Sequence, residues 1–399
     1  MAALGRGLRE TYTPLLFHSG GLAGPRDIYA RATEVQRTQE SAQALLGQLL
    51  LPSASSRSSS SCPSKAGNAG GSGGAGADYS SCGGPLELHV AQEGWLDILH
   101  PQPGRCPLLR TMELALFASD PWTDHLREDG SATLMAGLGA ATGADGGRFP
   151  AWNESYDHFF DALRCRMCHG KALPCNPADP AVCVTQEQAD AVFRQGNWEF
   201  RYRYTGYERA LKTRLEAGPL FDAIVGNMIA RMAQNGPLAD CALLPVAPGG
   251  KDGDSSSAAD DAPPQLPQIR NGTARPLVLL STHDDMVGAV LGALNFTGWD
   301  WPPFASNIVF ELWAVVDNSD DGESGDSGGG GGDVDGGGNG GEADGACPEY
   351  VVRVVYNGRV MPLPFCGEAT ATECPWRQFW AFARDALLWR AIEEECGVG

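Results

Sequence analysis

The sequence predicts an α/β fold whose core comes from two separate parts of the chain, with a mainly helical insertion between them. Apolar, strand-like runs followed at once by helical periodicity occur near the N-terminus and again after residue 275. The middle of the chain has helical periodicity and little strand character. These two observations give the fold class, and the individual elements follow from local patterns.

The N-terminal part predicts two helices and two strands. Leu4, Leu8 and Tyr12 recur at a spacing of four, which indicates a helix. Thr33 and Gln36 have the spacing of a capping box, which predicts that a second helix begins there. The predicted elements are a helix over residues 1–14, a strand over 27–30, a helix over 33–50 and a strand over 86–90.

The remainder predicts a helical stretch and then a second strand–helix unit. The run from Pro276 to Ser281 is strongly apolar and suits a buried strand. Two later runs alternate or stay apolar and suit strands that lie next to each other. The predicted elements are helices over residues 155–172 and 187–234, a strand over 276–281, a helix over 285–294, strands over 307–316 and 350–357, and a helix over 377–392.

Composition shifts predict the domain boundaries. We assign residues 1–105 and 275–399 to a discontinuous core and residues 106–274 to a helical cap insertion. Runs rich in Gly, Ser, Ala or Asp predict low-complexity loops. They cover residues 52–84, 128–148, 247–268 and 317–346. The last run resembles calcium-binding glycine repeats but lacks their regular period, so we interpret it as a solvated insertion.

Charge and composition exclude some function classes. The net charge of −20 argues against a general binder of nucleic acid or of anionic membranes, although a local basic site remains possible. No apolar stretch has the length of a membrane span. The 12 cysteines and the sequons at Asn153, Asn271 and Asn295 favour an oxidising, secretory compartment. That compartment conflicts with the start at Met1, which lacks the pattern of a signal peptide.

The strongest local candidate for chemistry is the run from Val278 to Asp285. An apolar strand here delivers His283 and Asp284 at its carboxyl end, directly before a helix. Ligands in α/β proteins bind at such strand ends, and free N–H groups at a helix start favour an anion. The alternative is a strand end with an ordinary helix cap.

Arg31 is the second candidate because it follows a predicted strand and precedes a helix. A guanidinium there can bind two phosphate oxygens in bidentate fashion. A surface ion pair is the alternative for this residue taken alone.

Two further patterns have weaker functional readings. Cys165-Arg166-Met167-Cys168-His169 matches the covalent haem pattern, but structural cysteines at a helix end are favoured over haem or zinc. Basic residues over 194–214, interleaved with aromatics, suit either anion steering or a solvated helix face. We therefore expect no cofactor and no metal.

Taken together, several runs resemble one family. Thr282-His283-Asp284 through to Glu311 resembles the C-terminal signature of the histidine acid phosphatases, the second branch of the histidine phosphatase superfamily. Met361 to Cys366 and the segment Arg31 to Thr38 are similar to further parts of that family. Trp301-Pro302-Pro303-Phe304-Ala305 is most like the lysophosphatidic acid phosphatase subgroup. The resemblance covers approximately residues 1–50, 86–110, 155–235 and 275–390.

The resemblance implies a fold, a reaction and three roles. The fold is a mixed-sheet α/β core with an inserted helical cap. Arg31 and His283 bind the phosphoryl group, and Asp284 is the general acid that protonates the leaving alcohol. The implied substrate is a small-molecule phosphomonoester, with a lysophospholipid as the candidate of the subgroup.

The family also implies a segment that this sequence does not contain. Its first strand carries Arg-His-Gly-x-Arg-x-Pro, whose histidine attacks phosphorus and forms a phosphohistidine. None of the seven histidines lies in such a motif. We therefore expect a truncated form that lacks the first core strand and the nucleophile and is inactive. A non-catalytic, phosphate-binding relative is the alternative, and the full-length form is expected to be secretory, lysosomal or mitochondrial.

Overall fold

The computed structural model describes the two ends and the middle of the chain. The described residues are 1–16, 27–50, 86–90, 97–101, 106–144, 150–234, 275–315, 349–387 and 396. The predicted low-complexity loops over 52–84, 247–268 and 317–346 lie outside them. Among the described residues, both parallel and antiparallel strands occur together with a majority of helix, so the predicted α/β class is confirmed.

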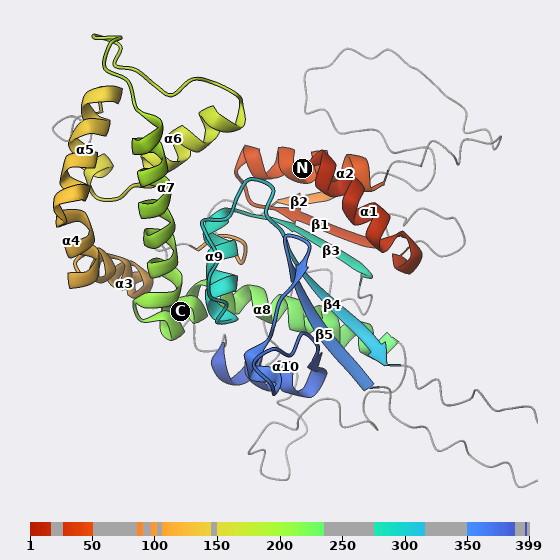
Figure 1. The fold of residues 1–399 in the computed structure, drawn as a ribbon. Coiled ribbons are helices and arrows are strands. Elements are labelled where there is room, and N and C mark those ends of the chain that lie inside the picture. The colour runs from red at the N-terminus through yellow and green to blue at the C-terminus, as the bar shows by residue number, and fades with distance from the viewer. Residues whose placement is uncertain are drawn as a thin grey trace, which may run out of the picture.

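A three-stranded parallel sheet forms the first half of the core (Figure 1). It contains β1 (Ile28–Ala32), β2 (Leu88–Val90) and β3 (Leu277–Ser281) in the order β2-β1-β3. Ile28 and Ala30 pack under α1 (Ala2–Leu16) and α2 (Gln36–Leu49). Tyr29 points to the other face and packs on Ala223 of α8 (Arg209–Gln234). Alternation along β1 thus buries both faces of the sheet.

An antiparallel sheet forms the second half. It contains β4 (Ile308–Val315), β5 (Glu349–Tyr356), β6 (Arg359–Val360) and β7 (Cys374–Pro375). The predicted neighbours β4 and β5 pair along their whole length. The main hydrophobic cluster lies between this sheet and α8, α9 (Asp284–Ala293) and α10 (Trp376–Ala386). Because α8 packs in this cluster, part of the predicted cap contributes to the core.

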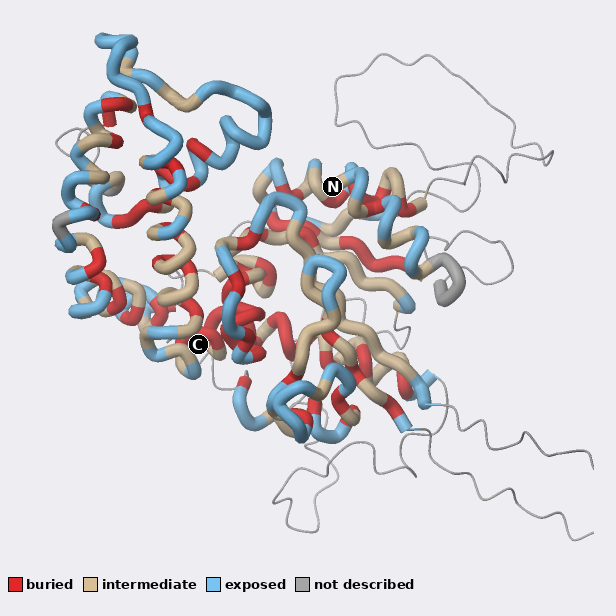
Figure 2. Tube along the Cα trace, viewed as in Figure 1, coloured by how far each residue is buried: buried red, intermediate tan, exposed pale blue. Residues whose placement is uncertain are grey.

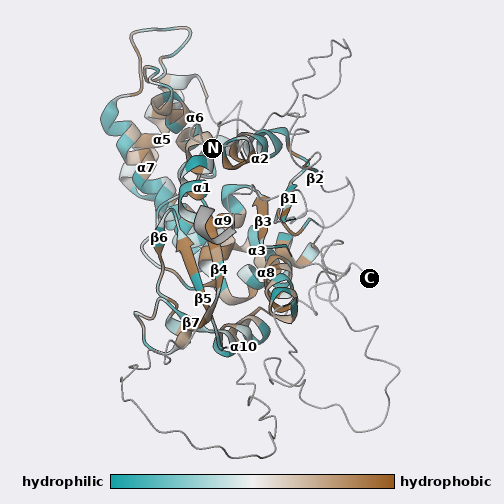
Figure 3. Cartoon of the chain, turned by 90° about the vertical axis from the view of Figure 1, so that its right-hand side faces the viewer, coloured by the Kyte–Doolittle hydropathy of each residue, from teal (hydrophilic) through white to brown (hydrophobic). Residues whose placement is uncertain are grey.

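The two sheets are separate, and the strands nearest the junction, β3 and β4, are less buried than their pairing partners β1 and β5. β4 is the strand of its sheet that lies towards β3 in both views (Figures 1 and 3). Four apolar residues of β3 are only half-buried, as are the first six residues of β4, whereas β1 is almost wholly buried (Figure 2). Apolar runs of this kind are typical of strands covered on both sides and both edges. The junction between β3 and β4 is therefore under-packed.

Helices α4–α7 stand to one side of the sheets, and we call them the helical layer (Figure 1). They are α4 (Asp120–Arg127), α5 (Asp129–Thr142), α6 (Asp157–Cys168) and α7 (Gln186–Arg201). α3 (Pro107–Phe117) leads into them, short 3-10 turns lie at Pro150–Asn153 and Pro364–Cys366, and a π-helical turn over Tyr202–Gly206 joins α7 to α8. Tyr156, Phe159 and Phe160 fill the interior of the layer.

Two local predictions are wrong. Residues 129–142 of the predicted loop 128–148 form α5. Alanine and leucine favour helices, and Leu138 and Ala141 are buried, so packing stabilises a glycine-containing helix that ends at Gly143. The capping box at Thr33 does not form, since α2 begins at Gln36 and the Thr33 hydroxyl bonds elsewhere.

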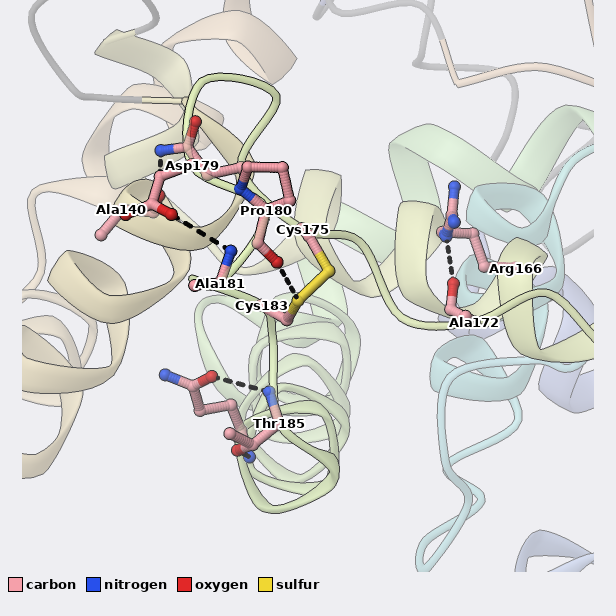
Figure 4. Close-up of a disulfide and its surroundings, with 11 residues drawn as sticks. Ala140, Arg166, Ala172, Cys175, Asp179, Pro180, Ala181, Cys183 and Thr185 are labelled. Carbon is pink, nitrogen blue, oxygen red and sulfur yellow. Dashed lines mark hydrogen bonds between the residues drawn. A yellow bond between two sulfur atoms is a disulfide. The ribbon is translucent and has the colours of Figure 1, made fainter.

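Three disulfides occur among the described residues. Cys106 pairs with Cys396 and Cys366 pairs with Cys374. The third disulfide, Cys175–Cys183, closes the loop before α7 (Figure 4). At the start of α7, Thr185 and Gln188 form a complete capping box. Separately, no helix among the described residues is long and apolar enough to cross a membrane.

Candidate active site

The three predicted site residues converge at one edge of the parallel sheet. β1 and β3 pair in register, with Ala30 opposite Leu279 and Ala32 opposite Ser281. Because parallel strands end at the same edge, Arg31 on β1 and the His283-Asp284 pair after β3 emerge together. The apolar side chains of β3 account for this placement, since they fix the strand in the core and leave the polar residues at its end.

Arg31 is held by a buried carboxylate. Its Nη2 donates to Asp97 Oδ1 at 2.8 Å, and the Asp97 side chain is only 1% exposed. The same oxygen accepts the backbone N–H of Leu99 at 3.0 Å. The hydroxyl of Thr282 bonds the Leu99 carbonyl and ties this segment to the end of β3. Arg31 is therefore ordered by its neighbours while its own side chain remains 14% exposed.

His283 lies in a chain of hydrogen bonds that fixes its tautomer. Arg37 Nη2 is 3.1 Å from Nδ1, and because a guanidinium only donates, Nδ1 accepts. Nε2 then carries the proton and donates to Thr33 Oγ1 at 3.1 Å. The Thr33 hydroxyl donates to Thr38 Oγ1 at 2.7 Å, and Thr38 donates to the Val35 carbonyl at 2.7 Å. In this arrangement, His283 is a neutral imidazole.

The surroundings of His283 oppose its protonation. Burial, the neighbouring His100 and Arg37 together lower its pKa from 6.5 to about 4. The rings of His100 and His283 are 4.7 Å apart. The Nδ1 atom of His100 is buried and has no hydrogen-bond partner among the described residues. His100, His283 and Arg37 thus gather at the end of β3, where an anion is expected to bind.

The lowered pKa of His283 predicts a pH dependence of stability. Above pH 6.5 the imidazole is neutral in both the folded and the unfolded chain. As the pH falls from 6.5 towards about 4, the unfolded chain binds a proton that the folded chain does not, so the free energy of unfolding decreases. We expect His283→Asn to reduce this slope in urea denaturation. His158→Asn, at an exposed position on α6, is the control, and equal slopes in parent and His283→Asn would contradict the prediction.

Asp284 begins α9 and is set up as an acid. Burial, with repulsion from Asp285, raises its pKa above the usual range. The indole N–H of Trp301 donates to Oδ2 at 2.5 Å and partly offsets this rise. A carboxyl with a raised pKa keeps its proton at mildly acidic pH, as a general acid must. Asp285 instead accepts the Tyr204 hydroxyl at 3.0 Å and lies 3.8 Å from Arg203.

Other sequence candidates do not join this cluster. Cys165 and Cys168 are free and exposed, and His169 only ends α6. Among the described residues, no three His, Cys, Asp or Glu side chains are grouped as metal ligands. The basic residues over 194–214 do not form a continuous basic surface, and they are not all exposed to solvent. Several of its members have partners inside the fold: Arg201 with Asp300, Arg203 with Asp285, Arg209 with the Gly292 carbonyl and Lys212 with Glu216.

Sequence reasoning missed the roles of Thr33, Arg37, Asp97, His100 and Trp301. The four-residue spacing of Thr33 and Arg37 places both side chains near the start of α2, so a role for them beside Arg31 could be predicted from the sequence. Asp97 and His100 lie on a short segment with no recognisable pattern. Only the tertiary fold brings that segment against β1 and β3.

Comparison with known proteins gives no match to a family model. The chain is 26% identical over 316 residues to testicular acid phosphatase of Mus musculus and 22% identical over 321 residues to counting factor 60 of Dictyostelium discoideum. Both matches cover more than three quarters of this chain, 77% and 78%, but the chain spans only 56% of either relative's length. A third relative, 2-phosphoxylose phosphatase 1 of Danio rerio, is 25% identical over 57% of this chain and 38% of its own length.

Solved structures extend the likeness to nearly the whole chain. Phytases from Hafnia alvei and Citrobacter braakii superpose with TM-scores of 0.52 and 0.53 at 13% and 14% identity. Each covers 99% of this chain and 86% of the phytase. The chain has the fold of these phytases. Within that fold, Arg31, His283 and Asp284 occupy the shared carboxyl edge of two paired strands, as described above.

Proposed function

We propose that this chain is the greater part of a phosphomonoesterase of the histidine acid phosphatase type. Arg31 and His283 bind the phosphoryl oxygens, and Asp284 protonates the leaving alcohol. The observation that carries the proposal is the placement of these three residues at one sheet edge, with His283 neutral and the pKa of Asp284 raised. The acid phosphatase and the 2-phosphoxylose phosphatase among the similar proteins support the same reaction class.

We propose further that the nucleophilic histidine lies on a strand that this sequence does not contain. Three histidines of the described residues have other partners. His89 stacks on Tyr29, His125 bonds buried Glu199, and His158 pairs with Asp157. The under-packed junction between β3 and β4 supports the proposal, because one added strand would pair with both and cover their apolar residues. Such a strand would end beside Arg31 and His283.

The test compares the 399-residue chain with the same chain extended by the residues that its own transcript encodes upstream of Met1. We expect the chain alone to bind inorganic phosphate in calorimetry and to hydrolyse no p-nitrophenyl phosphate. The extended form is expected to do both, and Arg31→Ala to remove both. Arg31-dependent hydrolysis by the chain alone would place the nucleophile within it. Absence of phosphate binding in both forms would refute the assignment of the site.

A non-catalytic, phosphate-binding relative is the second candidate, because Arg31 and His283 stand ready to bind an anion without a nucleophile. The upstream reading frame separates the two. An Arg-His-Gly strand there supports the enzyme, and its absence supports the non-catalytic relative.

We propose that the helical layer acts as the cap that selects the substrate and that the substrate is a lysophospholipid. The Trp301–Ala305 run supports this choice, and Phe304 within it is 56% exposed. A panel with the extended form compares lysophosphatidate with inositol hexakisphosphate. Preference for the inositol phosphate would refute the lipid assignment while leaving the reaction class intact.

A further inference from the structure

Trp301 joins the helical layer to the candidate general acid. It lies in the loop between α9 and β4, and its backbone N–H donates to Asn197 Oδ1 on α7 at 2.9 Å. Its indole stacks on Phe160 of α6 at 4.4 Å and on Phe200 of α7 at 4.6 Å. Trp301 is half-buried and packs against both the main hydrophobic cluster and the interior of the helical layer. Three contacts therefore fix the ring in place.

The fixed ring presents its only polar atom to Asp284. Indole Nε1 is 2.5 Å from Asp284 Oδ2. Because an indole N–H can only donate, Oδ2 must accept, and the proton of a neutral Asp284 is left to the other oxygen, Oδ1. An aromatic ring held by two stacks is a rigid donor, so it restricts the carboxyl to one orientation.

We propose that Trp301 is a positioning residue for Asp284, which places the acidic proton on Oδ1 and makes the acid depend on how α6 and α7 pack against the core. This inference rests on the proposed role of Asp284. In the transfer step, the Oδ1–H bond breaks, a new O–H bond forms on the leaving oxygen, and the electron pair stays on Asp284. The indole N–H then stabilises the carboxylate that results.

The charges around Asp284 favour its neutral form, so the Trp301 N–H has a large influence on its protonation. Asp285 on α9 and Asp161 on α6 both interact repulsively with Asp284, and both favour its neutral form. Asp157 on α6 and Arg37 on α2 act on Asp161 with opposite signs. Trp301 is the side chain that stabilises the ionised form of Asp284 by a hydrogen bond. Its loss should therefore leave only the backbone N–H groups of Asp284 and Asp285, which also lower the pKa of Asp284, to oppose burial and repulsion.

The test titrates Asp284 by carbon-13 NMR of its carboxyl in the 399-residue chain, assigned with Asp284→Asn. Trp301→Phe keeps an aromatic ring for stacking and removes the donor, so we expect the pKa of Asp284 to rise by about one unit. Trp299→Phe is the matched control. Trp299 is a buried tryptophan two residues away whose indole bonds the Phe296 carbonyl, and we expect no change there.

A second variant tests the link to the helical layer. Phe160→Leu removes one stacking partner and leaves the indole N–H in place, so we expect a smaller rise in the same direction. An unchanged pKa of Asp284 in a folded Trp301→Phe chain, or an equal rise in Trp299→Phe, would overturn the proposal. An unchanged pKa of Asp284 in Phe160→Leu would overturn the dependence on α6. If Trp301→Phe does not fold, Phe160→Leu provides the test instead. Since the titration needs no turnover, its outcome is independent of whether the chain is catalytically active.

Discussion

Arg31→Ala is expected to destabilise the chain by about 3–5 kcal/mol and to remove phosphate binding. The stability loss arises because Asp97, with a side chain only 1% exposed, is a buried carboxylate that loses the ion pair with the Arg31 guanidinium. The binding loss arises because charge-assisted hydrogen bonds to phosphate disappear, which weakens affinity by at least about tenfold. Urea denaturation measures the first effect and calorimetry with inorganic phosphate measures the second.

Two further variants separate these effects. Arg31→Ala combined with Asp97→Asn also removes the buried negative charge, so stability should recover in part while phosphate binding stays lost. Arg110→Ala breaks an exposed pair with Glu113 on α3 and should cost less than about 1 kcal/mol. Parent-like phosphate affinity in the double variant would show that Arg31 only supports the fold. A stability loss in Arg31→Ala no larger than in Arg110→Ala would refute the cost assigned to Asp97.

Lys212→Met is expected to have an effect of similar size with no link to the site. Lys212 and Glu216 lie one turn apart on α8, 2.6 Å from each other, with side chains 3% and 6% exposed. The ammonium also lies 4.5 Å from the Tyr204 ring. Removing it alone leaves a buried carboxylate whose pKa burial already raises, so we expect a loss of about 3–5 kcal/mol in urea denaturation.

The double variant Lys212→Met, Glu216→Leu decides whether the pair itself stabilises the fold. Two apolar side chains of similar size avoid the desolvation of both charges, so we expect stability within about 1 kcal/mol of the parent or above it. Asp300→Asn, in an exposed pair with Arg201, is the control with a small expected effect. A double variant as unstable as Lys212→Met would mean that the ion pair makes a net contribution that apolar packing does not replace.

Local patterns predict strands β1 to β5 and most helices, but not the two-residue strands β6 and β7, because each longer element depends on neighbouring residues. The apolar run of β3 and the periodicity of α9 are enough to predict that His283 and Asp284 lie at a strand–helix junction. The same reasoning failed for α5, where glycines suggested a loop and burial of Leu138 and Ala141 favoured a helix. It also failed at Thr33, whose hydroxyl bonds Thr38 and His283 rather than capping α2.

The amino-acid sequence by itself determined the α/β class, the candidates Arg31, His283 and Asp284, and the lack of an Arg-His-Gly motif. These follow from side-chain type and spacing, which are local. The tertiary structure alone decided that Asp97 holds Arg31, that Arg37 and Thr33 keep His283 neutral, and that Trp301 contacts Asp284. Those features join residues 17 to 250 positions apart, and no local pattern encodes which distant polar groups meet when apolar surfaces are buried.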